Sequence, residues 1–119
     1  MFLHKDKDVK EVAMDMEGVV GVVKRVLIGP QEGSDDTFMR LFTMKPGGHT
    51  PKHSHPYPHL IKWLSGMGVI LDGEGKENKI EVNMSAFVPK DEEHQFRNPS
   101  DYETCSFICV IPNPDKVEK

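Results

Sequence analysis

Short runs of apolar residues, separated by Gly, Pro, Asp and Asn, recur along most of this chain. The runs are rich in β-branched and aromatic residues, and none keeps a convincing helical period. They predict strands at 19–23, 26–28, 37–45, 60–64, 67–71, 79–82, 85–88, 94–97 and 104–111. Short strands with turn residues between them are typical of an antiparallel sandwich or barrel, so the predicted fold class is all-β.

The alternation within two of these runs indicates which side chains share a face, since successive residues of a strand point to opposite faces. In 37–45 one face carries Phe38, Arg40, Phe42 and Met44, and the other carries Met39, Leu41 and Thr43. In 104–111 the face predicted to line the barrel interior carries Cys105, Phe107, Cys109 and Ile111. The two cysteines are too far apart along an extended strand to form a disulfide.

Composition narrows the range of functions. A chain of 119 residues predicts one domain with one modest core. The formal charge of -4 argues against nucleic acid as a partner, because phosphate binding requires clustered Lys and Arg. No apolar run is long enough to span a membrane, and the N-terminus turns charged at once, so we expect a cytoplasmic protein without a signal peptide. The expected division is a tail or edge strand at 1–18, a barrel at 19–112 and a C-terminal tail at 113–119.

Histidines are concentrated in one stretch, where four of the six fall within residues 49–59. His53 and His55 are two positions apart, so on extended backbone they point to the same side. His59 follows a stiff Pro-Tyr-Pro linker, and His94 lies in a second polar segment far along the chain. Neutral imidazoles that converge from two strands are suitable ligands for Zn, Cu, Fe, Ni, Co or Mn. The alternatives are a histidine-rich surface loop and a structural zinc site with a closed tetrahedral shell.

Other side chains are candidates for the surroundings of such a metal. Arg40 is either a rim arginine with a buried stem or an anchor for an anion or peroxide near the metal. Cys109 is either a small buried residue or a thiol that a reactive metal–oxygen species oxidises. Ile61, Trp63 and Phe96 are either pocket wall or plain core.

Two segments of the sequence resemble the cupin motifs. Gly47, His53, His55, His59 and Gly66 have the spacing of the first motif, with His59 where family members usually carry Glu. Pro89, His94 and Asn98 resemble the second motif, with Asn83 and Asp91 where Gly is usual. The resemblance implies a single-domain cupin, an antiparallel double-stranded β-helix or jelly-roll barrel.

The chain is more specifically similar to the small single-domain manganese cupin of thermophiles. The similarity runs through 24–29, 39–43, 46–48, 53–56, 87–88, 96–98 and 109–112. It implies four metal ligands, His53, His55, His59 and His94, with Mn²⁺ as the metal and Fe²⁺, Zn²⁺, Ni²⁺ or Cu²⁺ as alternatives. It also implies a homodimer, often with exchanged N-terminal strands.

The leading functional hypothesis is a metal-dependent oxidoreductase that uses dioxygen or peroxide to oxidise or cleave a small organic molecule. Because many cupin dioxygenases use a glutamate at the position of His59, mechanisms that require a carboxylate there are disfavoured. A non-enzymatic binding module for a small molecule or metal is the first alternative. Lewis-acid isomerase or lyase chemistry is the second, with Glu92 or Glu93 as candidate acid–base groups.

Overall fold

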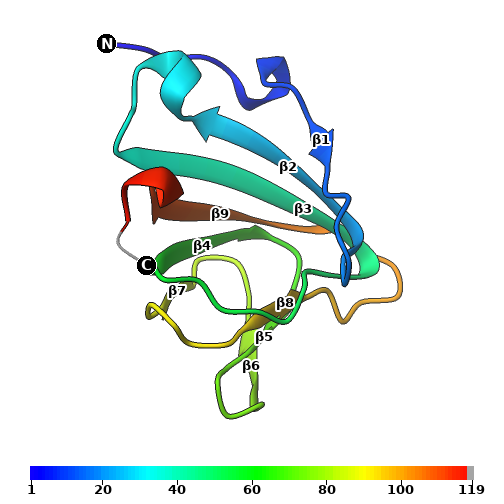
Figure 1. Ribbon diagram of the computed structural model, residues 1–119. Helices are drawn as coiled ribbons and strands as arrows, with labels where there is room; N and C mark the ends of the chain where they lie inside the picture. The colour runs from blue at the N-terminus through cyan, green and yellow to red at the C-terminus, as the bar shows by residue number, and fades with distance from the viewer. Residues whose placement is uncertain (118–119) are drawn as a thin grey trace.

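The structure, a computed structural model, describes residues 1–117 as nine strands in one sheet that curls into a nearly closed jelly-roll barrel (Figure 1). The strands are β1 Val12–Ala13, β2 Val20–Ile28, β3 Thr37–His49, β4 His59–Ser65, β5 Gly68–Leu71, β6 Glu77–Ile80, β7 Ser85–Val88, β8 Gln95–Arg97 and β9 Cys105–Pro112. The strand order is β6-β5-β8-β3-β9-β4-β7, with β2 beside β3 and β1 beside β2, and every pairing is antiparallel. The predicted all-β fold class is confirmed.

Strand β3 holds the two halves of the sheet together. It pairs with β2 and β9 along most of its length, and its last residue, His49, pairs with Arg97 of β8. The strand predicted at 37–45 was too short, because β3 continues through Pro46-Gly47-Gly48 to His49. Gly47 adopts a φ of 74°, and a Cβ on Gly48 would lie 2.9 Å from the carbonyl oxygen of Val20. The two glycines therefore allow β3 to bend sharply against β2 and to continue into the second half of the sheet.

Two other strand predictions require correction. Residues 19–23 and 26–28 form one strand, β2, whose register with β3 shifts at Val20–Val22 and at Val26–Ile28. The strand predicted at 79–82 lies two residues earlier, at Glu77–Ile80, because the turn after Leu71 is tight and Glu77 pairs directly with Leu71. In each case the register with the paired strand sets the boundary; this strand is β3 for β2 and the preceding strand, β5, for β6.

The inward faces of β3, β4 and β9 build the core. Phe42 lies opposite Phe107, which in turn lies opposite Trp63 of β4. The Phe107 ring stacks on both, at 5.2 Å from Phe42 and 4.7 Å from Trp63. Cys105 and Cys109 are buried free thiols on the same face, as predicted. This apolar layer packs beneath the histidine-containing end of the barrel.

Both ends of the described chain fold back against the barrel. Residues before β2 form a 3₁₀ turn, η1 (Asp6–Asp8), and the short edge strand β1. After β9, the Asn113 side chain donates a hydrogen bond to Asp35 O at 2.7 Å, and η3 (Pro114–Lys116) follows it. A third 3₁₀ turn, η2, spans Pro30–Glu32. None of the helices in residues 1–117 is long and apolar enough to cross a membrane.

Candidate metal centre

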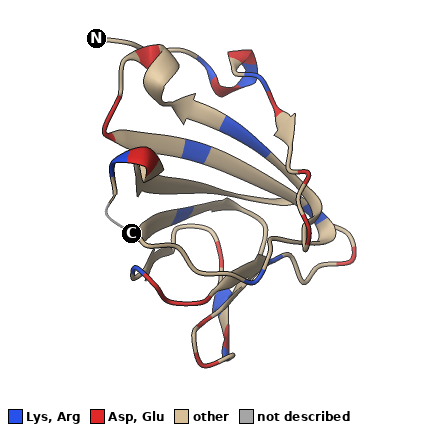
Figure 2. Cartoon of the chain, in the orientation of Figure 1, with Lys and Arg blue, Asp and Glu red and all other residues tan. Residues whose placement is uncertain are grey.

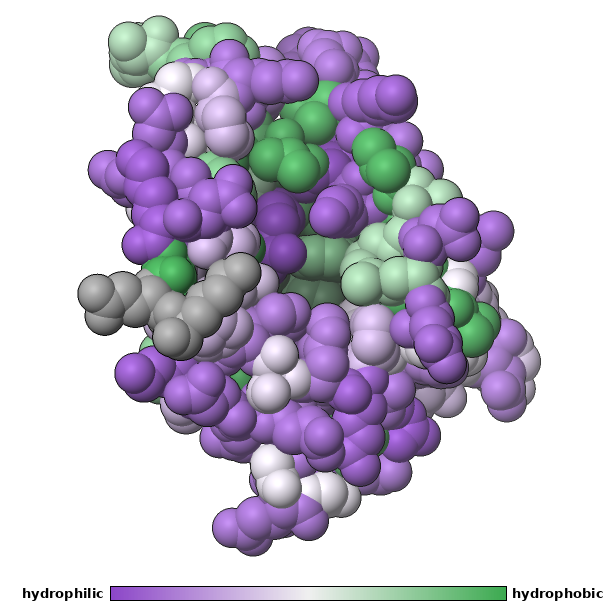
Figure 3. Space-filling model, in the orientation of Figure 1, coloured by the Kyte–Doolittle hydropathy of each residue, from purple (hydrophilic) through white to green (hydrophobic). Residues whose placement is uncertain are grey.

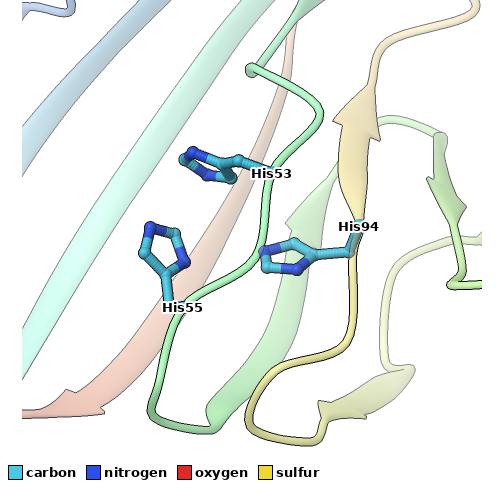
Figure 4. Close-up of side chains that lie close together, drawn as sticks. All are labelled: His53, His55 and His94. Carbon is cyan, nitrogen blue, oxygen red and sulfur yellow. The ribbon is translucent and has the colours of Figure 1, made fainter. Parts of the chain in front are cut away.

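Backbone hydrogen bonds bring the two histidine segments together. His53 and His94 form an isolated antiparallel bridge, in which each amide N–H donates to the other carbonyl, at 3.1 and 2.9 Å. Asp91 N donates to His55 O at 2.7 Å, which ties the loop before β8 to the loop before β4. Segments about forty positions apart in sequence are thereby held side by side (Figure 4).

The turn before β7 and the loop before β8 adopt their conformations without the glycines usual in the second cupin motif. Asn83 and Asp91 both have positive φ, 72° and 68°. Asn and Asp tolerate this left-handed conformation better than other side chains do. The two departures from the motif are therefore conservative in backbone geometry, and His94 still reaches the site.

His53, His55 and His94 point toward one another, and each offers a ring nitrogen within 4.8 Å of the others (Figure 4). His53 and His55 come from the loop before β4, and His94 immediately precedes β8. The His59 ring is adjacent to this group, with its centroid 4.8 Å from that of His94 and 5.0 Å from that of His55. Three histidines thus form a group that could hold a metal ion, and the fourth predicted ligand lies directly beside it.

The pKa values of His53, His55 and His59 are lowered, which favours the neutral form in which imidazoles bind metals. Burial, and then the neighbouring histidines and Arg40, lowers the pKa of His59 to about 3 and that of His55 to about 4. Burial and His94 also lower the pKa of His53. His94 Nδ1 lies 2.9 Å from Glu92 O, so it donates a proton there and leaves Nε2 as the lone-pair nitrogen.

The residues fit a divalent transition metal. Nδ1 of His55 and Nδ1 of His59 are buried without a hydrogen-bond partner, so the rings are not committed to other groups on that side. An all-imidazole donor set suits Zn, Cu, Fe, Ni, Co or Mn and does not select one of them.

The histidines open into a cavity of about 190 Å³ at the mouth of the barrel. Phe42, Phe96 and Phe107 supply apolar wall, and Thr50, Lys24 and Arg40 supply polar wall. Figure 3 shows a hollow on this face, bordered by both hydrophilic and hydrophobic residues. The volume is below the roughly 300–1,000 Å³ of pockets for drug-sized ligands, which indicates a small guest.

Several predicted surrounding residues do line this cavity. They are Arg40, Phe96 and Cys109. Arg40 Nη2 donates to Cys109 Sγ at 3.0 Å, and the guanidinium lies 4.9 Å from the centroid of the Phe42 ring. Burial raises the pKa of the Cys109 thiol, while the Arg40 charge and hydrogen bond oppose this effect. The thiol is therefore held against a cation at the cavity wall.

Ile61 and Trp63 occupy the core below the cavity and are absent from its lining. Trp63 is 1% exposed, and its indole N–H donates to Gly66 O at 3.0 Å. The packing therefore supports the interpretation of Ile61 and Trp63 as core residues and not as pocket wall. Their side chains share a face with Cys109 and Phe107, but they lie on β4, one strand further from the opening.

Sequence reasoning missed Lys24, Thr50 and the N-terminal methionines Met14 and Met16, all of which line the cavity. Lys24 pairs with Phe42 across β2 and β3, so its inward position follows from the strand register. The only sequence signal was a charged pair, Lys24-Arg25, inside a run of valines. Thr50 Oγ1 accepts the Phe96 amide proton at 2.9 Å and so fixes the start of the histidine loop against β8.

A second, larger cavity of about 420 Å³ lies between β6 and β7, the two edges of the sheet that do not pair. Ile70, Ile80, Ala86 and Val88 form part of its lining. His94 lines this cavity as well as the smaller one. The ring of His94 therefore separates the metal-centre cavity from the open seam of the barrel.

Known proteins resemble this chain in both sequence and structure. A stretch of 73 residues is 30% identical to 1-methylthio-D-xylulose 5-phosphate methylsulfurylase of Rhodospirillum rubrum, covering 61% of this chain and 46% of that protein. The chain spans less than two thirds of the length of the curated relatives it matches. The polyketide cyclase RemF from Streptomyces resistomycificus superposes with a TM-score of 0.89 at 28% identity, over 95% of this chain and 80% of that one.

A structure described as a predicted oxalate decarboxylase from Thermotoga maritima has the same fold. It superposes with a TM-score of 0.82 at 21% identity, over 93% of this chain and 98% of that chain. The cupin domain family matches residues 40–111, a region that includes Arg40, Cys109 and all four histidines of the site. This match covers more than half of the chain, so the protein belongs to the cupin domain family.

Proposed function

We propose that this protein is a metal-dependent oxidoreductase that acts on a small organic molecule with dioxygen or peroxide as the oxidant. The observation that carries the proposal is the convergence of neutral histidines from two segments on one small cavity. His53, His55 and His94 hold the metal, with His59 as the fourth ligand. Mn²⁺ and Fe²⁺ are the preferred ions, since both are redox-active and accept imidazole ligands.

The chain's own residues define the conditions in the cavity. Four neutral imidazoles leave the charge of a divalent ion uncompensated, which favours an anionic or strongly polar guest. When bound, the ion supplies Lewis acidity and, if redox-active, a route for electrons. Phe42, Phe96 and Phe107 exclude water from the wall of the cavity, which strengthens electrostatic interactions within it.

Non-oxidative Lewis-acid chemistry is a second candidate. None of the described residues that line the cavity is a carboxylate, and the conjectured acid–base groups Glu92 and Glu93 are outside it. Proton transfer would then depend on the substrate's own groups, as suits a cyclisation or isomerisation of a polarised carbonyl compound. The resemblance to a polyketide cyclase supports this candidate.

The experiment begins with metal analysis of protein purified without a His-tag, followed by oxygen and peroxide consumption by Mn²⁺- and Fe²⁺-loaded protein. We expect substrate-dependent consumption of oxidant that His53→Ala abolishes together with metal binding. His49→Ala is the matched control, because His49 is outside the lining of the cavity and belongs to β3. Turnover without oxidant consumption would replace the first candidate by the second, and ligand retention without turnover would identify a binding module.

A further inference from the structure

Two positive side chains border the metal cavity on the wall formed by β2 and β3. Lys24 faces Phe42 across the two strands, and Arg40 is two residues from Phe42 on β3. Residues opposite each other in an antiparallel pair share a face, and so do residues two apart on a strand, so Lys24 and Arg40 are diagonal neighbours on the inner face. Both line the cavity that contains the histidines.

Neither cation has an acidic partner within the described part of the chain. The salt bridges among residues 1–117 involve Arg25, Lys52, Arg97 and Lys116, and not Lys24 or Arg40. Arg40 Nε is buried and has no hydrogen-bond partner, and only Nη2 is engaged, by Cys109 Sγ. Figure 2 shows the basic segments of β2 and β3 on neighbouring strands, with the acidic residues on surrounding loops and turns.

Two unpaired positive side chains on one cavity wall are electrostatically unfavourable unless a bound anion neutralises them. Two half-buried cations repel each other, and burial together with the Arg40 charge lowers the pKa of Lys24. Buried charges are normally paired, and an unpaired Arg N–H in a wall of low polarity is a vacant donor. The protein carries a formal charge of -4 overall, so this local excess of positive charge is specific to the cavity.

We propose that Lys24 and Arg40 form an acid-group subsite, which binds the carboxylate or phosphate of the substrate beside the metal centre. The substrate class is then a small organic acid. The planar guanidinium of Arg40 supplies a charged, forked donor group on the cavity wall, and the Lys24 ammonium adds a second positive charge from the neighbouring strand. The stack of Arg40 on Phe42 and its bond to Cys109 hold the guanidinium in position.

This inference deepens the proposed function and rests on it in one respect, that the bound acid is the substrate of a reaction. The anion site itself can be tested without turnover. The probes are acetate and inorganic phosphate, titrated into ¹⁵N-labelled full-length protein in metal-free and Zn²⁺-loaded form. The readout is the side-chain Nε–H resonance of Arg40. We expect a saturable shift, tighter with Zn²⁺ present because the metal adds positive charge. The probe that binds more tightly identifies the acid group.

Lys24→Gln is the informative variant, because Lys24 is partly exposed and its replacement leaves the core unchanged. We expect it to weaken anion binding by about tenfold, the usual effect of losing one charged hydrogen bond. Lys62→Gln, the same change on the outer face of β4, is the control and should leave the dissociation constant unchanged. Arg40→Lys, followed through the Cys109 amide, should also weaken binding, because the charge stays but the fork of donors is lost.

Three results would each overturn the subsite. They are equal anion affinity of Lys24→Gln and the parent protein, an equal loss of affinity in Lys62→Gln, and the lack of a saturable shift with either probe. His53→Ala separates the two proposals. If it loses metal but retains the Lys24-dependent shift in metal-free protein, the subsite stands independently of the metal chemistry. If metal binding and oxidant consumption are found while the shift is absent, the proposed function stands and the subsite is wrong.

Discussion

At the scale of single residues, the histidines are the groups whose properties the fold changes most. Burial is the main reason why the pKa of His59 falls to about 3 and that of His55 to about 4, from an ordinary value of 6.5. Each of these rings binds fewer protons in the folded chain than in the unfolded chain below that value. Their contribution to stability is therefore present above pH 6.5 and is lost as the pH falls toward the folded-state pKa values.

We predict that His59→Gln reduces the pH dependence of stability in metal-free protein. The parent should lose free energy of unfolding as the pH falls from about 6.5 to about 4, partly because unfolding lets His59 take up a proton. Urea unfolding at several pH values measures both slopes. Identical slopes for the parent and His59→Gln would show that His59 is not held neutral by the fold.

At the scale of elements, the short turn from β4 to β5 depends on a glycine. A Cβ on Gly68 would lie 2.1 Å from Cζ2 of Trp63, which is 1% exposed and fixed by its bond to Gly66 O. Gly75, in the turn between β5 and β6, has a φ of 79°, but a Cβ there would meet nothing within 4 Å. The two glycines therefore serve different purposes, close packing at Gly68 and backbone conformation at Gly75.

We predict that Gly68→Ala lowers the free energy of unfolding by about 3 kcal/mol or more, because the buried indole has to move. Gly75→Ala should lower it by only about 1 kcal/mol, the usual effect of a side chain in left-handed backbone. Denaturant unfolding of both variants, with near-ultraviolet circular dichroism for Trp63, makes the comparison. A smaller loss at Gly68 than at Gly75 would contradict the packing argument.

A buried asparagine connects the loop after β8 to β3. The Asn98 side chain is 3% exposed as a residue and donates to Met44 O at 3.0 Å and to Glu103 O at 2.7 Å. Its Oδ1 accepts the Ser100 amide proton at 3.0 Å. We predict that Asn98→Ala lowers the free energy of unfolding by about 2–4 kcal/mol, because it leaves buried polar groups without partners.

The control for this prediction is Asn78→Ala, since Asn78 is exposed and water can replace its hydrogen bonds. Its loss should be within about 1 kcal/mol. Thermal or denaturant unfolding provides both values. An equally small effect at Asn98 would mean that water satisfies the Met44 and Glu103 carbonyls when the amide is removed.

At the scale of the whole molecule, the homodimer that the resemblance implies stays a prediction. The structure offers it an edge, because β1 covers only Val23 and Lys24 of the outer side of β2. An open strand edge of this length is suited to pairing with a second copy. Val20, near the start of this edge, is 53% exposed.

We predict a dimer by light scattering at micromolar concentration, and a shift toward monomer in Val20→Lys, because a charge on a strand edge opposes edge-to-edge pairing. Val82→Lys, at another exposed valine away from β2, serves as the control and should leave the mass unchanged. A monomeric parent protein would contradict the predicted homodimer. The metal centre lies within one chain and would be unaffected.

Part of the barrel and part of its site could be predicted from the sequence. The alternation of Phe38, Arg40, Phe42 and Met44 predicted that these residues share one face of β3. The histidine pattern predicted the group of His53, His55 and His94 that could hold a metal ion. The continuation of β3 through Pro46-Gly47-Gly48 could not be predicted, because its end pairs with β8, a strand distant in the chain. The boundary at 79–82 was missed because the register of the β5–β6 hairpin sets it. His59 was expected as an equal ligand, and its ring lies beside the three-histidine group.

Sequence alone therefore determined the all-β class, the cupin motifs and the residues able to bind a metal, since these follow from side-chain period and donor type, which are local properties. Tertiary structure alone decided which residues share the cavity. It brought Lys24 next to Arg40, moved Trp63 into the core and placed His94 between two cavities. The physical reason is strand register, which fixes neighbours across the sheet and is set by the packing of the entire barrel.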